Sequence, residues 1–265
     1  DYINYMYGYV VPSTGYLERF RMFTYDGNFI CQYPRYEMNG EIPEFKDEPT
    51  FSKVLNRAYK WAKICNADLI SGINAHVSED TEIDFINMNE TLHNDMLHDL
   101  GNQILSDIEN IKLICIAGPS SSGKTTFSNR LRIELMARGI TPLRISLDMY
   151  YKNREDIPLG ADGKPDLECL ESIDVPLFND QLVELLAGRE VELPLYSFKT
   201  KRRLEQGVRL RVDGDQVLVV EGIHGLNSAL SEEIPSELKY RVYVSALTQL
   251  NLDGHNRIRT TDVRL

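Results

Sequence analysis

The sequence predicts an α/β protein whose main domain is a doubly wound parallel sheet, preceded by a smaller α+β domain. Two apolar runs carry this prediction. Leu113–Ala117 has strand character and leads through a glycine-rich turn directly into a helical pattern. Val217–Val220 (VLVV) lacks polar alternation, which is typical of a strand buried on both faces of a parallel sheet. Strand and helix patterns alternate between these two runs.

The glycine-rich turn is Gly118-Pro-Ser-Ser-Ser-Gly123-Lys124-Thr125, with the spacing G-x-x-x-x-G-K-[ST] of a phosphate-binding loop. The glycines let the backbone wrap an anion, and the following helix adds its N-terminal partial positive charge. Lys124 would reach the β- and γ-phosphates of a nucleoside triphosphate, and the Thr125 hydroxyl would bind Mg²⁺. ATP and Mg²⁺ are therefore the expected cofactors, and the fold is predicted to be of the P-loop NTPase type. The predicted nucleotide-binding residues are Gly118, Ser120, Ser121, Ser122, Gly123, Lys124, Thr125 and Thr126.

The bulk composition fits a globular protein with one large domain or two unequal ones in its 265 residues. No apolar run is long enough to span a bilayer and no leader pattern opens the chain, so we expect a cytoplasmic location and no membrane partner. The chain begins mid-pattern at Asp1 and stops at Leu265 without a terminator, and it is expected to be a fragment or to lack disordered ends. The cysteines form no C-x-x-C pair, so neither a disulfide framework nor a zinc site is indicated. They are Cys31, Cys65, Cys115 and Cys169.

The net charge of −11 is concentrated in the N-terminal part of the chain. Residues 1–110 carry 8 basic against 18 acidic residues, or −10, whereas residues 111–265 carry 21 against 22, or −1. An acidic surface repels nucleic acid, so no nucleic-acid partner is expected. The near-neutral C-terminal part suits a small-molecule acceptor as partner, and a homo-oligomer remains open.

The N-terminal domain is predicted to span residues 1–110 and the P-loop domain residues 111–265. In the first, Asp26-Gly27 between aromatic residues predicts a β-hairpin, and we expect two or three antiparallel strands. Helical spacing follows at Phe51–Cys65 and from about Ile83 to Glu109. The elements expected after the phosphate loop are helix Phe127–Ala137, strand Thr141–Leu147, an irregular stretch at 152–170, helix Asn179–Leu186, a polar β-like excursion Val191–Val212, strand Val217–Val220 and strand Tyr240–Ser245.

Two carboxylates follow strands whose carboxyl ends meet at one edge of the predicted sheet. Asp148 comes after the second strand and fits a general base that takes the proton of an attacking hydroxyl; the alternative is a turn cap. Glu221 ends the VLVV strand and fits the Walker-B role of holding Mg²⁺; the alternative is an ordinary strand-end charge. A third carboxylate, Asp174, lies in the loop before a helix. Lys124 would act with Asp148 in catalysis by stabilising charge on the transferred phosphoryl group.

Other polar residues leave alternatives open. His93 and His98 are five residues apart and about 140° apart on a helix, so they cannot share a metal ion and are expected on a solvated face. His224 follows Glu221-Gly222-Ile223 and has either a loop-stabilising or a substrate-side role. The Lys199–Arg203 run is either a solvated hairpin edge or a phosphate or substrate contact.

These residues together resemble the uridine kinase / phosphoribulokinase group of P-loop kinases. The segments that carry the resemblance are IAGPSSSGKTT (116–126), ISLDMYY (145–151), ESIDVPLF (171–178), ELPLYSFKTKRR (192–203), VVEGIHGLN (219–227) and TTDVRL (260–265). The N-terminal stretch YGYVVPSTGYLERF (7–20) resembles part of the threonyl-tRNA-synthetase-like region fused to a bacterial branch of such kinases.

The resemblance implies roles at matching positions. Asp148 would be the catalytic base. The implied substrate residues are Tyr151, Asp174 and Tyr196 near a nucleoside, with Asp174 on the ribose hydroxyls, and Arg203 and Arg264 near the phosphates, with Arg264 in a lid. Lys201 stands where uridine kinases place the histidine that reads the pyrimidine base, so the acceptor stays open. The synthetase-like region lacks the H-x-x-x-H metal pair, so zinc binding and tRNA editing are not expected.

The expected function is ATP- and Mg²⁺-dependent phosphoryl transfer to a hydroxyl of a small molecule, most plausibly a nucleoside 5′-hydroxyl. Two alternatives remain. The first is a sugar-phosphate kinase of the phosphoribulokinase type, in which the basic Lys199–Arg203 run anchors a phosphorylated acceptor. The second is a nucleotide-binding regulatory module that has no small-molecule acceptor and uses ATP turnover as a timer.

Overall fold

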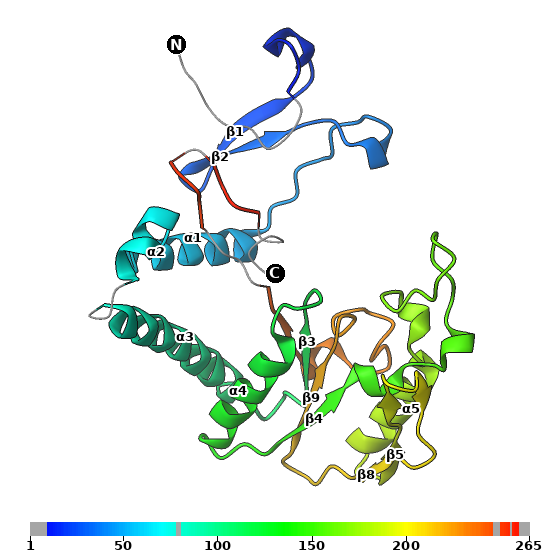
Figure 1. The fold of residues 1–265 in the computed structure, drawn as a ribbon. Coiled ribbons are helices and arrows are strands. Elements are labelled where there is room, and N and C mark those ends of the chain that lie inside the picture. Colours follow the sequence, from blue (N-terminus) through cyan, green and yellow to red (C-terminus); the bar gives the residue numbers. More distant parts are fainter. Residues whose placement is uncertain (1–9, 78–80, 246–249, 255, 260–265) are drawn as a thin grey trace. The chain divides into compact units, whose positions relative to one another are not determined.

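The computed structural model describes residues 10–77, 81–245, 250–254 and 256–259 (Figure 1). The described residues form two compact units. The first comprises residues 10–77, 81–89, 250–254 and 256–259, and the second comprises residues 90–245. The division falls inside one helix, ahead of the boundary predicted at residue 110.

The first unit contains the predicted hairpin. Strands β1 (Arg21–Tyr25) and β2 (Asn28–Gln32) pair antiparallel, with Tyr25 opposite Asn28. Asp26 and Gly27 both have positive φ, at 47° and 75°, which matches the twist of a tight two-residue hairpin turn. The sheet has two strands in the described residues, at the lower end of the expected range. The remaining elements of the first unit are η1 (Thr14–Tyr16), η2 (Tyr36–Met38), α1 (Pro49–Ile64), α2 (Ile70–His76) and the start of α3 (Glu82–Leu105).

The second unit is built on four parallel strands. They are β3 (Leu113–Ala117), β4 (Pro142–Ser146), β9 (Val217–Glu221) and β10 (Lys239–Tyr243), in the order β10-β3-β9-β4. Successive residues of these strands enter two separate cores. Leu113 and Cys115 pack into one core with α5 (Val175–Leu186), whereas Ile114 and Ile116 pack into the other with α4 (Lys124–Met136). Both faces of the sheet are therefore covered, and the predicted doubly wound parallel sheet is confirmed.

The helix α5, two short strand pairs and several 3₁₀ turns complete the second unit. The helix α5 begins four residues before the predicted start because the Asp174 carboxylate accepts a hydrogen bond from the Leu177 amide and Pro176 fits the first helical turn. The polar excursion forms two antiparallel pairs, β5 (Val191–Leu193) with β8 (Val208–Leu210) and β6 (Tyr196–Ser197) with β7 (Arg202–Arg203). The 3₁₀ turns are η3 (Leu147–Tyr150), η4 (Arg154–Asp156), η5 (Leu170–Ser172) and η6 (Ser236–Leu238). None of the helices in the described part of the chain has the length and apolar character of a membrane-spanning segment.

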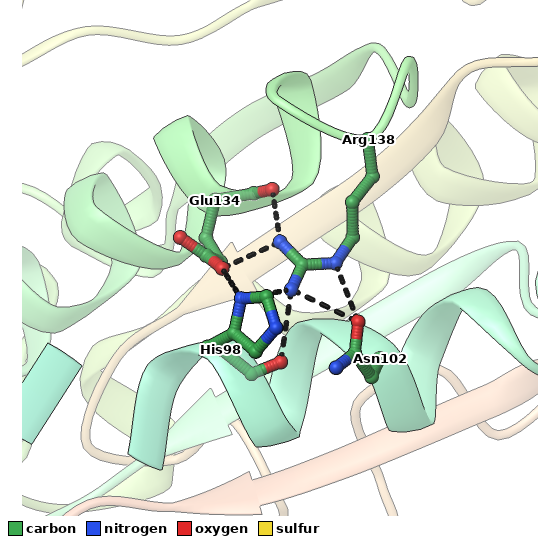
Figure 2. Close-up of polar contacts among 4 residues, drawn as sticks. All are labelled: His98, Asn102, Glu134 and Arg138. Atoms are coloured by element: carbon green, nitrogen blue, oxygen red, sulfur yellow. Dashed lines mark hydrogen bonds and ion pairs between the residues drawn. The ribbon is translucent and has the colours of Figure 1, made fainter. Parts of the chain in front are cut away.

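The second half of α3 belongs with the sheet unit because polar side chains tie it to α4. Figure 2 shows Arg138, just after α4, donating from Nη2 to the His98 carbonyl at 3.0 Å and to Asn102 Oδ1 at 3.0 Å. Its Nη1 donates to the carbonyl and carboxylate of Glu134.

A second arginine, Arg130 of α4, contacts α3 nearer its start, where Arg130 Nη1 lies 3.0 Å from His93 Nδ1. His98 is exposed as expected, but His93 is half-buried and faces Arg130, so the expectation of a solvated face was wrong for His93.

The His93 contact makes stability depend on pH. Because a guanidinium only donates, His93 Nδ1 must be unprotonated to accept from Arg130. Desolvation lowers the pKa of His93 below 6.5 and the Arg130 charge lowers it further, although Glu90 opposes them. A lowered folded-state pKa means that the stabilising contribution is present above 6.5 and is lost as the pH falls through the folded-state value. Between about pH 8 and pH 5, the unfolding free energy of the unaltered chain should fall more than that of His93→Gln, which cannot titrate. Chemical denaturation at each pH measures this, and parallel pH curves would refute it.

Candidate functional site

The phosphate loop joins β3 to α4, and its two glycines are required for different reasons. A Cβ on Gly118 would lie 2.1 Å from the Val244 carbonyl oxygen, so the loop backbone approaches the end of β10 more closely than any side chain allows. Gly123 has φ +82° and precedes the first residue of α4. Because the first amides of a helix have no acceptor within it, those at Lys124, Thr125 and Thr126 point outward from the start of α4. This geometry is a ready anion site.

Side chains around the loop carry the polar groups that a phosphate and a cation need. The Lys124 ammonium donates to the Pro119 carbonyl at 2.9 Å, folded back over the loop. The Ser122 hydroxyl is buried and has no hydrogen-bond partner among the described residues. The Thr125 hydroxyl donates to Glu221 Oε1 at 3.3 Å, which joins the start of α4 to the end of β9.

Asp148 and Glu221 lie at the carboxyl ends of strands, as the sequence predicted, and the structure shows that these strands, β4 and β9, are adjacent. Glu221 is 5% exposed, whereas Asp148 can be reached by solvent. Nevertheless, partial desolvation raises the pKa of the Asp148 carboxyl above 3.8, and the Glu221 carboxylate raises it further. The positive charge of Lys124 lowers the Asp148 pKa and so opposes both effects. The charges of Glu221 and Lys124 are therefore close enough to act on Asp148. The Ser146 hydroxyl also accepts from the Asp148 amide, so the turn geometry of the alternative interpretation is present as well.

Arg203 holds together the residues that follow Asp148 and the residue that precedes α5. From β7 it donates to Tyr151 O through Nε, to Asp174 Oδ2 through Nη1 and to Tyr150 O through Nη2, each at 3.0 Å. Its own amide donates to Asn153 Oδ1 at 3.0 Å. A single guanidinium therefore fixes the residues that follow Asp148 against the N-terminus of α5.

Three aromatic rings form a cluster beside Asp148. The Tyr151 ring centroid lies 5.5 Å from that of Tyr196 and 5.9 Å from that of Phe198, and the last two are 5.1 Å apart. Burial raises the pKa of Tyr151 to about 12, and the nearby Asp148 carboxylate adds to this effect. The Tyr151 hydroxyl donates to Leu167 O at 3.0 Å, so this ring is held in place. Phe198 is 57% exposed and offers a free apolar face.

A cavity of about 360 Å³ opens next to this cluster. It is lined by Lys152, Asn153, Asp156, Asp174 and Arg203. Of these five residues, the sequence pointed to Asp174 and Arg203 alone, because residues 152–170 have an irregular pattern. The signal that was missed is the polar Lys152-Asn153 pair immediately after Tyr151, at the edge of the sheet where ligands bind.

The structure brings most of the predicted site residues together within the second unit. Asp148 lies near Glu221, Lys124 and Tyr151, and Tyr151 joins Tyr196, Arg203 and Asp174 through the contacts above. Lys201 lies at the tip of the β6–β7 hairpin with φ 58°, and His224 Nε2 is buried with no hydrogen-bond partner among the described residues. Arg264 lies outside the described residues.

This fold and loop define a P-loop nucleotide-binding protein. The chain belongs to the phosphoribulokinase / uridine kinase family, because the family model matches residues 113–259, more than half of its length. It is therefore a member of a family of kinases, as expected from sequence.

Individual relatives cover the same part of the chain. The uridine kinase of Deinococcus deserti is 31% identical over 57% of this chain and 72% of its own length, and that of Lactobacillus helveticus is 27% identical over 60% and 75%. The uridine kinase of Schizosaccharomyces pombe is 35% identical over 51% of this chain, which spans only 28% of that relative. A solved structure described as a possible uridine kinase from Bacillus stearothermophilus matches with a TM-score of 0.47 and 22% identity, over 57% of this chain and 79% of that one.

Proposed function

We propose that the protein transfers the γ-phosphoryl group of ATP to a hydroxyl of a small molecule, namely the 5′-hydroxyl of a nucleoside. The observation that carries this proposal is that Asp148, Glu221 and Lys124 lie close together at one edge of the sheet. Thr125, next to Lys124, donates to Glu221 at the end of β9, and β9 pairs with β4, which leads to Asp148. A phosphoryl-transfer site needs a base for the acceptor, oxygen ligands for a cation and a positive charge on the transferred group. Each of the three residues supplies one of these.

The loop residues would hold ATP. The amides from Ser120 to Thr126 and the orphaned Ser122 hydroxyl would receive the phosphate oxygens, and Lys124 would swing from Pro119 to the β- and γ-phosphates. Thr125 and Glu221 offer a hydroxyl and a carboxylate, which are the oxygen ligands that Mg²⁺ prefers. When bound, Mg²⁺ neutralises charge on the phosphates.

Asp148 would accept the proton of the attacking hydroxyl. Its raised pKa makes it a stronger base than an ordinary aspartate, while Lys124 keeps its ionised form accessible. The aromatic cluster of Tyr151, Tyr196 and Phe198 suits a planar base or a sugar ring, and the named relatives support a nucleoside.

The two alternatives receive less support. For a sugar-phosphate kinase, the cavity beside Arg203 would need an excess of positive charge, but Lys152 and Arg203 there are balanced by Asp156 and Asp174. For a regulatory module without an acceptor, the aromatic cluster and the Arg203 contacts beside Asp148 would have no use.

We also propose that the protein acts in the cytoplasm and that residues 7–20 belong to a threonyl-tRNA-synthetase-like region.

ADP release from ATP and Mg²⁺ should be measured against a panel of nucleosides and sugar phosphates. Stimulation by uridine or cytidine supports the proposal despite Lys201. Stimulation by a phosphorylated sugar alone would favour the phosphoribulokinase type. Nucleotide binding without stimulation by any acceptor would contradict the kinase proposal and favour the regulatory module.

The acceptor side offers a matched pair of arginines. Arg203→Lys should lower kcat/KM for the acceptor about tenfold or more, because one ammonium cannot replace the fork that reaches Asp174 and two carbonyls. Arg202→Lys should stay within about twofold, since Arg202 makes an exposed ion pair with Glu155. Steady-state kinetics at saturating ATP measures both, and equal losses would refute the role of Arg203.

A further inference from the structure

The β6–β7 hairpin has a backbone amide that the hairpin itself does not satisfy. The Leu204 amide donates to the Leu195 carbonyl at 2.8 Å, and the next pair along is Tyr196 opposite Arg203. Because hydrogen-bonded and non-hydrogen-bonded pairs alternate in an antiparallel ladder, the Arg203 amide points away from β6. This amide therefore requires an acceptor from another part of the chain.

Asn153 supplies that acceptor from a stretch of chain 50 residues earlier. Its Oδ1 accepts from the Arg203 amide at 3.0 Å. Because a backbone amide only donates, the side-chain oxygen must face it, and the orientation of the Asn153 side-chain amide is fixed. Beside this bond, the Arg154 amide donates to the Lys201 carbonyl at 3.3 Å. Residues 153 and 154 thus close the open edge of β7.

The Arg203 side chain bonds to the same stretch of chain that holds its backbone. The guanidinium donates to the carbonyls of Tyr150 and Tyr151 and to the Asp174 carboxylate. The Tyr150 carbonyl also accepts from the Asp174 amide at 2.9 Å, so Asp174 is tied to this stretch by its backbone as well. A planar fork of fixed geometry can reach all three acceptors from one position only. The place of the Arg203 backbone therefore decides whether the guanidinium meets Asp174.

Asn153, Arg203 and Asp174 all line the cavity of about 360 Å³ beside the aromatic cluster. We propose that Asn153 is a positioning residue for acceptor binding and that it acts through Arg203. By fixing the Arg203 backbone, Asn153 holds the guanidinium against Asp174 and keeps Tyr196, which stands opposite Arg203, beside the cavity. The inference rests on the proposed function, because it requires that an acceptor bind at this cavity.

Two substitutions of Asn153 and one matched control test this role in the full chain. Asn153→Ala removes the acceptor of the Arg203 amide, whereas Asn153→Asp keeps an oxygen at the same place and lacks only the amide nitrogen. The control is Asn179→Ala. Asn179 Oδ1 accepts from the Ser231 amide at 2.8 Å across 52 residues, so its loss removes a bond of the same kind from residues that do not line the cavity.

Three measurements are made on each variant. Steady-state kinetics gives kcat and KM for the nucleoside that stimulates ADP release, and calorimetry gives the affinity for a non-hydrolysable ATP analogue. Hydrogen exchange follows the Arg203 amide in the absence of any acceptor. Asn153→Ala is also combined with Arg203→Lys, because a residue that acts through Arg203 should lose its effect once the guanidinium is gone.

We expect Asn153→Ala to lower kcat/KM for the nucleoside about tenfold, mainly by raising KM, with affinity for the ATP analogue within about twofold. The Arg203 amide should exchange about tenfold faster in this variant. Asn153→Asp should restore both properties to within about threefold. Asn179→Ala should lower the melting temperature and leave KM unchanged. In the Arg203→Lys background, Asn153→Ala should cost about twofold or less.

Equal losses of kcat/KM in Asn153→Ala and Asn179→Ala would show a general effect on stability, and would overturn the inference while the proposed kinase activity stands. A loss in Asn153→Asp as large as in Asn153→Ala would also overturn it, because the amide nitrogen would then contact the acceptor directly. The same holds for an undiminished loss in the Arg203→Lys background. If no acceptor stimulates ADP release by the unaltered chain, the proposed function fails and the inference fails with it.

Discussion

Asp148→Asn is expected to lower phosphoryl transfer to the acceptor by about 10²–10⁴-fold, because asparagine is isosteric but cannot take a proton. ATP affinity should change little, since the loop amides, Lys124 and the Thr125–Glu221 pair remain. In the unaltered enzyme, activity should fall with decreasing pH as Asp148 becomes protonated, and the midpoint should lie above 3.8 because desolvation and, to a smaller extent, the Glu221 charge raise the Asp148 pKa. The variant should lack this acid limb. A pH profile of kcat/KM, with calorimetry for ATP, checks all three expectations.

Asp162→Asn is the matched control for this change. Asp162 is exposed, and its contacts within the described part of the chain are a hydrogen bond from the Lys164 amide and a surface ion pair with the Lys164 ammonium. The Asp162→Asn variant should therefore retain full phosphoryl transfer to the acceptor. Loss of ATP binding together with transfer in Asp148→Asn would show that Asp148 supports the loop rather than activates the acceptor.

Features set by local sequence were predicted well. The Asp26-Gly27 turn fixes its own hairpin, since both residues adopt the positive φ that such a turn requires. The phosphate loop between β3 and α4 follows from its glycine spacing alone. The proximity of Asp148 to Glu221 needed one more step, namely that parallel strands end at the same edge of a sheet.

Features set by distant partners could not be predicted. Arg203 contacts Tyr150 and Tyr151 across about fifty residues. The family resemblance singled out Arg203, but nothing in the Lys199–Arg203 run itself predicts these contacts or distinguishes Arg203 from the exposed Arg202. The helix α2 has seven residues, including Gly72, and its propensity is too weak to mark it. Residues 250–254 and 256–259 lie within the stretch that the family model matches but belong to the first unit, and hydrogen bonds of Asn251 with Asp68 and Ile70 show this.

Gly118→Ala is expected to abolish measurable nucleotide binding, a loss of about 100-fold or more. The new methyl group would lie 2.1 Å from the Val244 carbonyl and 2.8 Å from the Ser122 hydroxyl, and the first of these is backbone that cannot rotate away. Either the loop or the end of β10 must then move, and the amides no longer converge on phosphate. Gly160→Ala is the control, because the nearest atom to its Cβ is 3.5 Å away, an ordinary contact. Calorimetry with ADP compares the two, together with their melting temperatures. If Gly118→Ala bound ADP as tightly as Gly160→Ala did, the loop would tolerate displacement of Val244, and the phosphate site would need another explanation.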